Sequence, residues 1–125
     1  LTGEYVAAVI LEENILKLAD QKKEPLKVIY PKDGILMVPS PIGIFNTTKN
    51  PDAAKAAVDW WLSKEGQEAV VKGYMHSVRG DVKPPAGAPE LKTLLPNAVK
   101  TDWEKLSKNS AQIKDEFRAR VLDKK

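Results

Sequence analysis

The chain has 125 residues, 42% of them hydrophobic, which suits one globular domain and is too apolar for a disordered segment. Lysine and arginine total 20 against 17 acidic residues, and the net charge of +3 is spread along the chain, so we expect no nucleic-acid partner. The absence of cysteine excludes disulfides, thiolate nucleophiles and cysteine metal sites. With His76 as the only histidine and no nucleophile motif, we expect neither an enzyme nor a cofactor.

Residues 5–11 are a continuous apolar run rich in β-branched side chains, which predicts a strand buried on both faces of a largely parallel sheet. Glu12, Glu13 and Asn14 follow directly. Open α/β sheets bind ligands outside the carboxyl ends of their strands, so these side chains are candidate ligand contacts. The competing interpretation is that the acids only favour the dipole of the helix expected from about residue 13 to residue 19.

Three further strands are expected at residues 26–30, 35–38 and 42–45. Pro31-Lys32-Asp33-Gly34 predicts the turn between the first two, because Asp and Gly tolerate turn geometry. Pro39-Ser40-Pro41 interrupts the last two with prolines that cannot donate to a ladder. A strand that passes through this interruption must change its partner, its sheet or its direction.

The remainder of the chain predicts four helices. Asn50-Pro51-Asp52 is typical of a helix start, and a break at residues 63–66 separates this helix from a second one over residues 67–74. Residues 81–89 are rich in proline and glycine and predict an irregular surface strap. Arg79, just before it, either clamps an anion or pairs with Asp81.

Two helices are expected after the strap. Thr101 and Glu104 stand at capping-box spacing and predict the start of the first. The second carries Ile113, Phe117 and Val121 as a narrow apolar seam on an otherwise charged surface. The order is thus α/β in class, strands followed by a run of helices. This order does not close a sheet by itself, and we expect the N-terminal part of the same protein to complete it.

Six motifs in order resemble the C-terminal part of the ferric-iron type of bacterial solute-binding protein, a branch of the type II periplasmic binding proteins. They are Gly3-Glu4-Tyr5, Tyr30-Pro31-Lys32-Asp33-Gly34, Val38-Pro39-Ser40-Pro41-Ile42-Gly43-Ile44, Asn50-Pro51-Asp52-Ala53-Ala54, Leu62-Ser63-Lys64-Glu65-Gly66-Gln67-Glu68 and Val78-Arg79-Gly80-Asp81-Val82. The resemblance covers nearly the whole chain.

This resemblance implies two α/β lobes joined by hinge strands, with the ligand in the cleft between them. Residues 1–30 would end the second lobe, residues 31–41 would form the crossover strand, and residues 42–125 would return to the first lobe. Pro39, Ser40 and Pro41 would then be hinge residues.

Iron-binding members hold the metal with two adjacent tyrosines, because phenolate oxygens suit ferric iron. Glu13 and Asn14 stand at the corresponding positions here, so we expect no metal held in that manner. Binders of sugar phosphates, phosphonates and polyamines are relatives without the pair. Two carboxylates at Glu12 and Glu13 favour a solute with donor groups, such as hydroxyls or an amine.

The expected function is capture of a small polar solute or ion outside the cytoplasmic membrane and its delivery to an ABC permease. The location is periplasmic or otherwise extracytoplasmic, with a lipid anchor in a bacterium that has a single membrane. The alternative is a ligand-sensing protein of the same fold that signals to a membrane receptor kinase.

Overall fold

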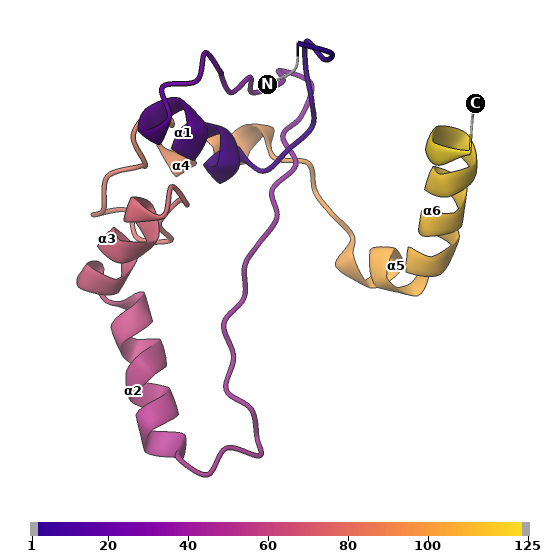
Figure 1. The fold of residues 1–125 in the computed structure, drawn as a ribbon. Coiled ribbons are helices and arrows are strands. Elements are labelled where there is room, and N and C mark those ends of the chain that lie inside the picture. The colour runs from indigo at the N-terminus through magenta and orange to yellow at the C-terminus, as the bar shows by residue number, and fades with distance from the viewer. Residues whose placement is uncertain (1–2, 124–125) are drawn as a thin grey trace.

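The computed structural model describes residues 3–123, and this part of the chain is helical wherever it is regular (Figure 1). Its elements are α1 (Glu12–Gln21), α2 (Pro51–Leu62), α3 (Lys64–Lys72), α4 (Leu91–Leu94), the 3-10 turn η1 (Leu95–Asn97), α5 (Trp103–Lys108), α6 (Ser110–Phe117) and the π-helical turn η2 (Arg118–Leu122).

The first three helices lie where local signals place them. Pro51 occupies the first turn of α2, as predicted, although the Asn50 side chain makes no capping hydrogen bond. α3 begins earlier than the sequence indicated, because the Ser63 hydroxyl caps it by accepting the Gly66 N–H at 3.1 Å. α2 and α3 are therefore separated by a single residue.

The start of α5 differs from the expected capping box. Asp102, not Thr101, is the cap, and its carboxylate accepts the Lys105 N–H at 2.9 Å. A carboxylate also interacts favourably with the positive end of the helix dipole, so Asp102 is the better cap of the two.

The short pair α4 and η1, which sequence patterning did not predict, follows the strap and supplies the buried Leu94.

The expected strands are not formed by the described residues. The segments at 5–11, 26–30, 35–38 and 42–45 lack ladder partners, and the only bridge there pairs Ile35 with Ala98 in parallel. Ile35 N–H donates to the Asn97 carbonyl, and Val99 N–H donates to the Ile35 carbonyl, both at 2.9 Å. Strands followed by helices are therefore not shown by residues 3–123, because a strand requires a hydrogen-bonded neighbour, which apolar periodicity does not supply.

The small core is made of side chains from α1, the end of α3 and the loop after it, the strap and α4. Its apolar side chains are Leu16, Val70, Tyr74 and Leu94, and Pro85 of the strap is fully buried. The strap also passes close to α1, since a Cβ at Gly87, whose φ is +85°, would lie 3.3 Å from Leu16 Cδ2. The strap is thus irregular and partly exposed, as predicted, and Pro85 anchors it to the core.

Much apolar surface remains uncovered outside this core. A long extended segment leads away from it to the start of α2, α2 runs back toward α3, and α5 and α6 form a separate arm (Figure 1). The accessible surface is 10778 Å², whereas a compact monomer of 13.8 kDa exposes about 6,600 Å². On the arm, Ile113, Phe117 and Val121 are 45%, 55% and 55% exposed, so the predicted seam exists but lies on nothing among the described residues.

The α2–α3 corner depends on the absence of a side chain at residue 66. A Cβ there would lie 2.2 Å from the Trp60 carbonyl oxygen and 2.7 Å from that of Trp61. We expect Gly66→Ala to lower the free energy of unfolding by about 1–3 kcal/mol, as overpacking does, measured by urea denaturation of the purified protein. Gly80→Ala is the matched control, because a Cβ at Gly80 meets nothing within 4 Å. Equal stability of the two variants would contradict the tight corner.

Candidate functional site

The predicted ligand contacts occupy the first turn of α1. Glu12 is its first residue, and both oxygens of its carboxylate are engaged. Oε1 accepts a hydrogen bond from the Tyr30 hydroxyl, and Oε2 lies 3.0 Å from His76 Nε2. The side chains of Glu12 and His76 are only 22% and 14% exposed, so this contact is largely shielded from water.

Glu13 and Asn14 are placed differently from Glu12. Glu13 is half-buried and Asn14 is exposed, and neither side chain is hydrogen-bonded to another described residue. Both therefore keep their polar atoms available at the N-terminus of α1. The carboxylates of Glu12 and Glu13 also lie at the positive end of the helix dipole, so the dipole interpretation and the ligand interpretation both fit this arrangement.

The environment of Tyr30 keeps its hydroxyl protonated. Burial raises the pKa of Tyr30 well above its usual range, and the hydrogen bond to the Glu12 carboxylate raises it further. A protonated phenol can donate to a carboxylate, whereas a phenolate would be repelled by it. Tyr30 thus acts as a hydrogen-bond donor toward Glu12.

A second carboxylate attaches the other end of α1 to the same loop. The Tyr74 hydroxyl donates to Asp20 Oδ2 at 2.5 Å, and Lys23 Nζ lies 3.4 Å from Asp20 Oδ1. Tyr74 is buried and has a φ of +67°, a left-handed conformation that costs free energy for a residue other than glycine. The backbone strain is offset by the contacts that this conformation allows, including the bond to α1.

Sequence reasoning missed Gln67, which organises the loop that carries His76. Its side chain is 3% exposed and uses both of its polar atoms. Nε2 donates to the Trp61 carbonyl at 2.9 Å, and Oε1 accepts the Ser77 hydroxyl at 3.0 Å and the Val78 N–H at 2.9 Å. The only signal for this role was the position of Gln67 in the motif Leu62-Ser63-Lys64-Glu65-Gly66-Gln67-Glu68.

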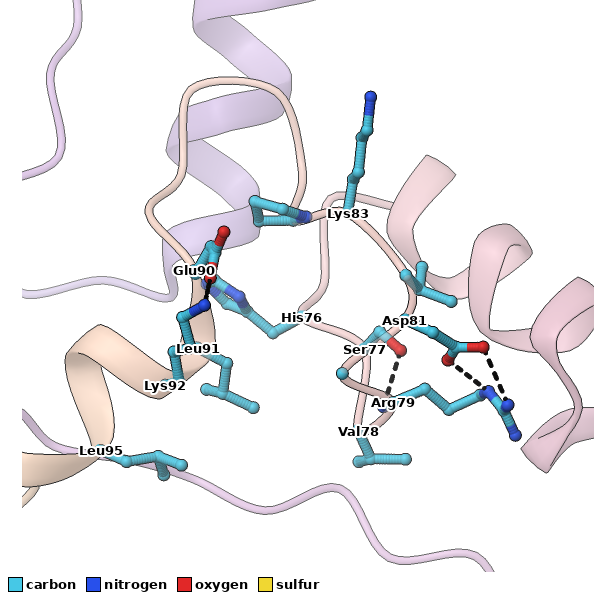
Figure 2. A pocket seen from close by; sticks show the side chains of 13 residues that line it. His76, Ser77, Val78, Arg79, Asp81, Lys83, Glu90, Leu91, Lys92 and Leu95 are labelled. Atoms are coloured by element: carbon cyan, nitrogen blue, oxygen red, sulfur yellow. Dashed lines mark hydrogen bonds and ion pairs between the residues drawn. The ribbon is translucent and has the colours of Figure 1, made fainter.

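A cavity of about 320 Å³ lies between this loop and α4 (Figure 2). Two ion pairs line it: Arg79 contacts Asp81 through Nε at 2.9 Å and through Nη2 at 3.0 Å, and Lys92 lies 2.5 Å from Glu90. Of the two roles considered for Arg79, binding an anion or pairing with Asp81, the described residues show the pairing with Asp81. The charges within the two pairs neutralise one another, and Lys83, which also lines the cavity, is in neither of them.

The predicted hinge residues lie in the long extended segment, apart from this network (Figure 1). Pro39, Ser40 and Pro41 are exposed, and the Ser40 side chain makes no hydrogen bond with the described residues. Their role as a hinge stays a prediction. Among residues 3–123, no cluster of three or more Asp, Glu or His side chains is arranged to hold a metal ion.

Comparison with known families gives one match. Residues 5–109 match the sequence model of the family described as bacterial extracellular solute-binding protein. Searches of curated proteins and of solved structures gave no match. None of the helices within residues 3–123 has the length and apolar character needed to cross a membrane.

The Asp20–Tyr74 contact predicts a pH dependence of stability. The Tyr74 hydrogen bond, followed by Lys23, holds the pKa of Asp20 below its usual value, and the bond to Asp20 raises the pKa of Tyr74. A lowered carboxyl pKa contributes stability that is present above the unfolded value, about 3.9, and is lost as the pH falls through the folded pKa. A raised phenol pKa contributes stability that is present below about 10 and is lost as the pH rises through the folded pKa.

We therefore expect Tyr74→Phe to be less stable than the wild type near neutral pH. The difference should shrink below about pH 4 and again above about pH 10. Urea denaturation of both proteins over a pH series measures the difference in their free energies of unfolding at the acidic and the alkaline end. A difference that is constant with pH would contradict the contact between Tyr74 and Asp20.

Proposed function

Because this chain belongs to the family of bacterial extracellular solute-binding proteins, we propose that it is the C-terminal portion of a ferric-iron-type member that delivers a small polar solute to an ABC permease. The observation that carries this proposal is the family match over residues 5–109, together with the uncovered apolar surface of the described residues. Cleft closure upon the solute is then the whole mechanism, and no covalent step is involved.

The exposed surface supports the two-lobe organisation. Val6 and Val9 are 105% and 98% exposed, although their segment has the composition of a fully buried strand. The surface exceeds that of a compact monomer by about 4,000 Å², so this chain alone exposes as much excess surface as a large obligate interface buries on both partners together. The N-terminal part of the same protein, with its own α/β lobe, is the partner that we propose covers this surface and completes the sheet.

The same organisation assigns a role to each part of the chain. Residues 1–30 end the second lobe, residues 31–41 cross between the lobes, and residues 42–125 return to the first lobe. The extended course of residues 36–45, which bond to no neighbouring strand among the described residues, supports a crossover that pairs with strands from elsewhere in the protein. Pro39-Ser40-Pro41 is the point at which this crossover changes sheet.

The solute is proposed to bind at the N-terminus of α1, in contact with Glu12, Glu13 and Asn14. The carboxylate of Glu13 and the amide of Asn14 are not hydrogen-bonded to other described side chains, so they can accept donors from a solute. Two adjacent carboxylates repel a phosphate and attract an ammonium or hydroxyl group. Among ferric iron, sugar phosphates, phosphonates and polyamines, the arrangement favours a polyamine, or the hydroxyl end of a sugar phosphate.

The ligand role of Glu13 can be tested in the complete protein with a thermal-shift panel of spermidine, glucose 6-phosphate, 2-aminoethylphosphonate and ferric citrate. We expect a donor-bearing solute to give the largest rise in melting temperature, because a ligand stabilises the folded state by mass action. Glu13→Gln should weaken binding of that solute about tenfold, the loss expected for one charge-assisted hydrogen bond.

The matched control is Glu68→Gln, which removes an exposed carboxylate from α3 and should leave the affinity unchanged. The largest shift with ferric citrate would contradict the donor-bearing class. Equal affinities of the Glu13 and Glu68 variants would remove Glu13 from the site.

A further inference from the structure

The carboxylate of Glu12 joins segments of the chain that are distant in the sequence. Tyr30, which donates to Oε1, is the last residue before the proposed crossover 31–41, and His76, on Oε2, belongs to the loop after α3. α1, the residue that leads into the crossover and the return segment therefore meet at one side chain. That side chain also stands at the end of α1 where the solute is proposed to bind.

We propose that Glu12 is a partner-exchange latch: a donor group of the bound solute replaces the Tyr30 hydroxyl on its carboxylate and thereby frees the crossover segment from α1. The proposal rests on the proposed function, because it places the solute at the N-terminus of α1. It adds a conformational consequence to binding, since the attachment that holds the crossover in the solute-free protein is lost when the solute arrives.

The chemistry of the three groups permits this exchange. A carboxylate offers about four acceptor positions, and Tyr30 and His76 occupy one on each oxygen, so an incoming donor can bind before Tyr30 leaves. A solute ammonium is a stronger donor to a carboxylate than a neutral phenol is. Tyr30 is only half-buried, so its released hydroxyl can hydrogen-bond to water and is not left unsatisfied.

The exchange acts on the crossover and not on α1. When Tyr30 leaves, α1 keeps its bond from Asp20 to Tyr74 at 2.5 Å, so it stays on the loop after α3. The crossover keeps its contacts with residues 97–99. Asn97 donates through Nδ2 to the Pro31 carbonyl at 2.7 Å and its carbonyl accepts the Ile35 N–H at 2.9 Å, while Val99 N–H donates to the Ile35 carbonyl at 2.9 Å. The Ile35 amide is therefore a reporter of how firmly the crossover is held.

Hydrogen exchange of peptides that contain the Ile35 amide, measured by mass spectrometry on the complete protein, tests the latch. Without solute, Tyr30→Phe should raise the exchange rate of this amide about fivefold, the effect of losing one hydrogen bond. Tyr74→Phe is the matched control, because it removes the equivalent hydroxyl at the other end of α1. It should raise exchange in α1 and leave Ile35 unchanged.

The solute step is tested by adding saturating spermidine to the same proteins. Spermidine should raise the Ile35 exchange rate of the wild type to the level of Tyr30→Phe, and should add nothing in that variant. The Tyr74→Phe protein should respond to spermidine as the wild type does, because its Glu12–Tyr30 contact is intact.

The outcomes separate this latch from the function on which it rests. Unchanged Ile35 exchange in solute-free Tyr30→Phe would overturn the latch whatever solute the protein binds. Spermidine that raises the melting temperature without altering Ile35 exchange would overturn the partner exchange and leave solute binding intact. If neither spermidine nor any other solute of the panel raised the melting temperature, the proposed site would fail, and the exchange with it.

Discussion

Two carboxylates at opposite ends of α1 hold this helix against the loop that follows α3, and the small core depends on that attachment. Glu12 contacts His76, and Asp20 contacts Tyr74, so the loop lies along the helix and is bound at both ends. The apolar side chain of Leu16 is buried between these two points. Without them, few apolar contacts would remain to keep α1 next to the rest of the chain.

The geometry of the loop has its own support from the α2–α3 corner. The close approach at Gly66 brings the end of α2 against the start of α3, which places the Trp61 carbonyl within reach of Gln67. Gln67 in turn fixes Ser77 and Val78, so the backbone around His76 is set by a fully satisfied buried amide. The positive φ of Tyr74 completes the turn between α3 and this loop. The position of Glu12 thus follows from packing some fifty residues further along the chain.

The proposed function connects the uncovered apolar surface with the candidate site. A solute-binding protein that closes on its ligand needs segments that pass between two bodies, and such segments cannot be stabilised by one body alone. The extended course of residues 36–45 among the described residues is what the proposed crossover requires. In that proposal the solute site at the N-terminus of α1 lies next to the start of the crossover, so the same few side chains would serve binding and movement.

The sequence by itself determined the features that depend on near neighbours. The presence of α1, α2 and α3 followed from apolar spacing and, for α2, from the proline at its start, because helical hydrogen bonds are local. The start of α3 at its cap Ser63 was missed. The choice of Asp102 over Thr101 as the cap of α5 lay within the same short range, but two adjacent residues offered competing caps. The order of six motifs also sufficed to indicate the family of solute-binding proteins that the comparison shows.

Only the tertiary structure decided what each polar side chain contacts. Glu12, Glu13 and Asn14 looked equivalent in the sequence, yet Glu12 alone is bound by Tyr30 and His76, residues 18 and 64 positions away. The sequence also left the partner of Arg79 open, and it gave no indication that the amide of Gln67 is buried. The expected strands are not formed among the described residues for the same reason, since a ladder requires a partner that apolar periodicity does not specify. Contacts between distant residues depend on how the chain packs. The sequence pattern indicates which secondary structure a segment favours, but not which other segment it packs against.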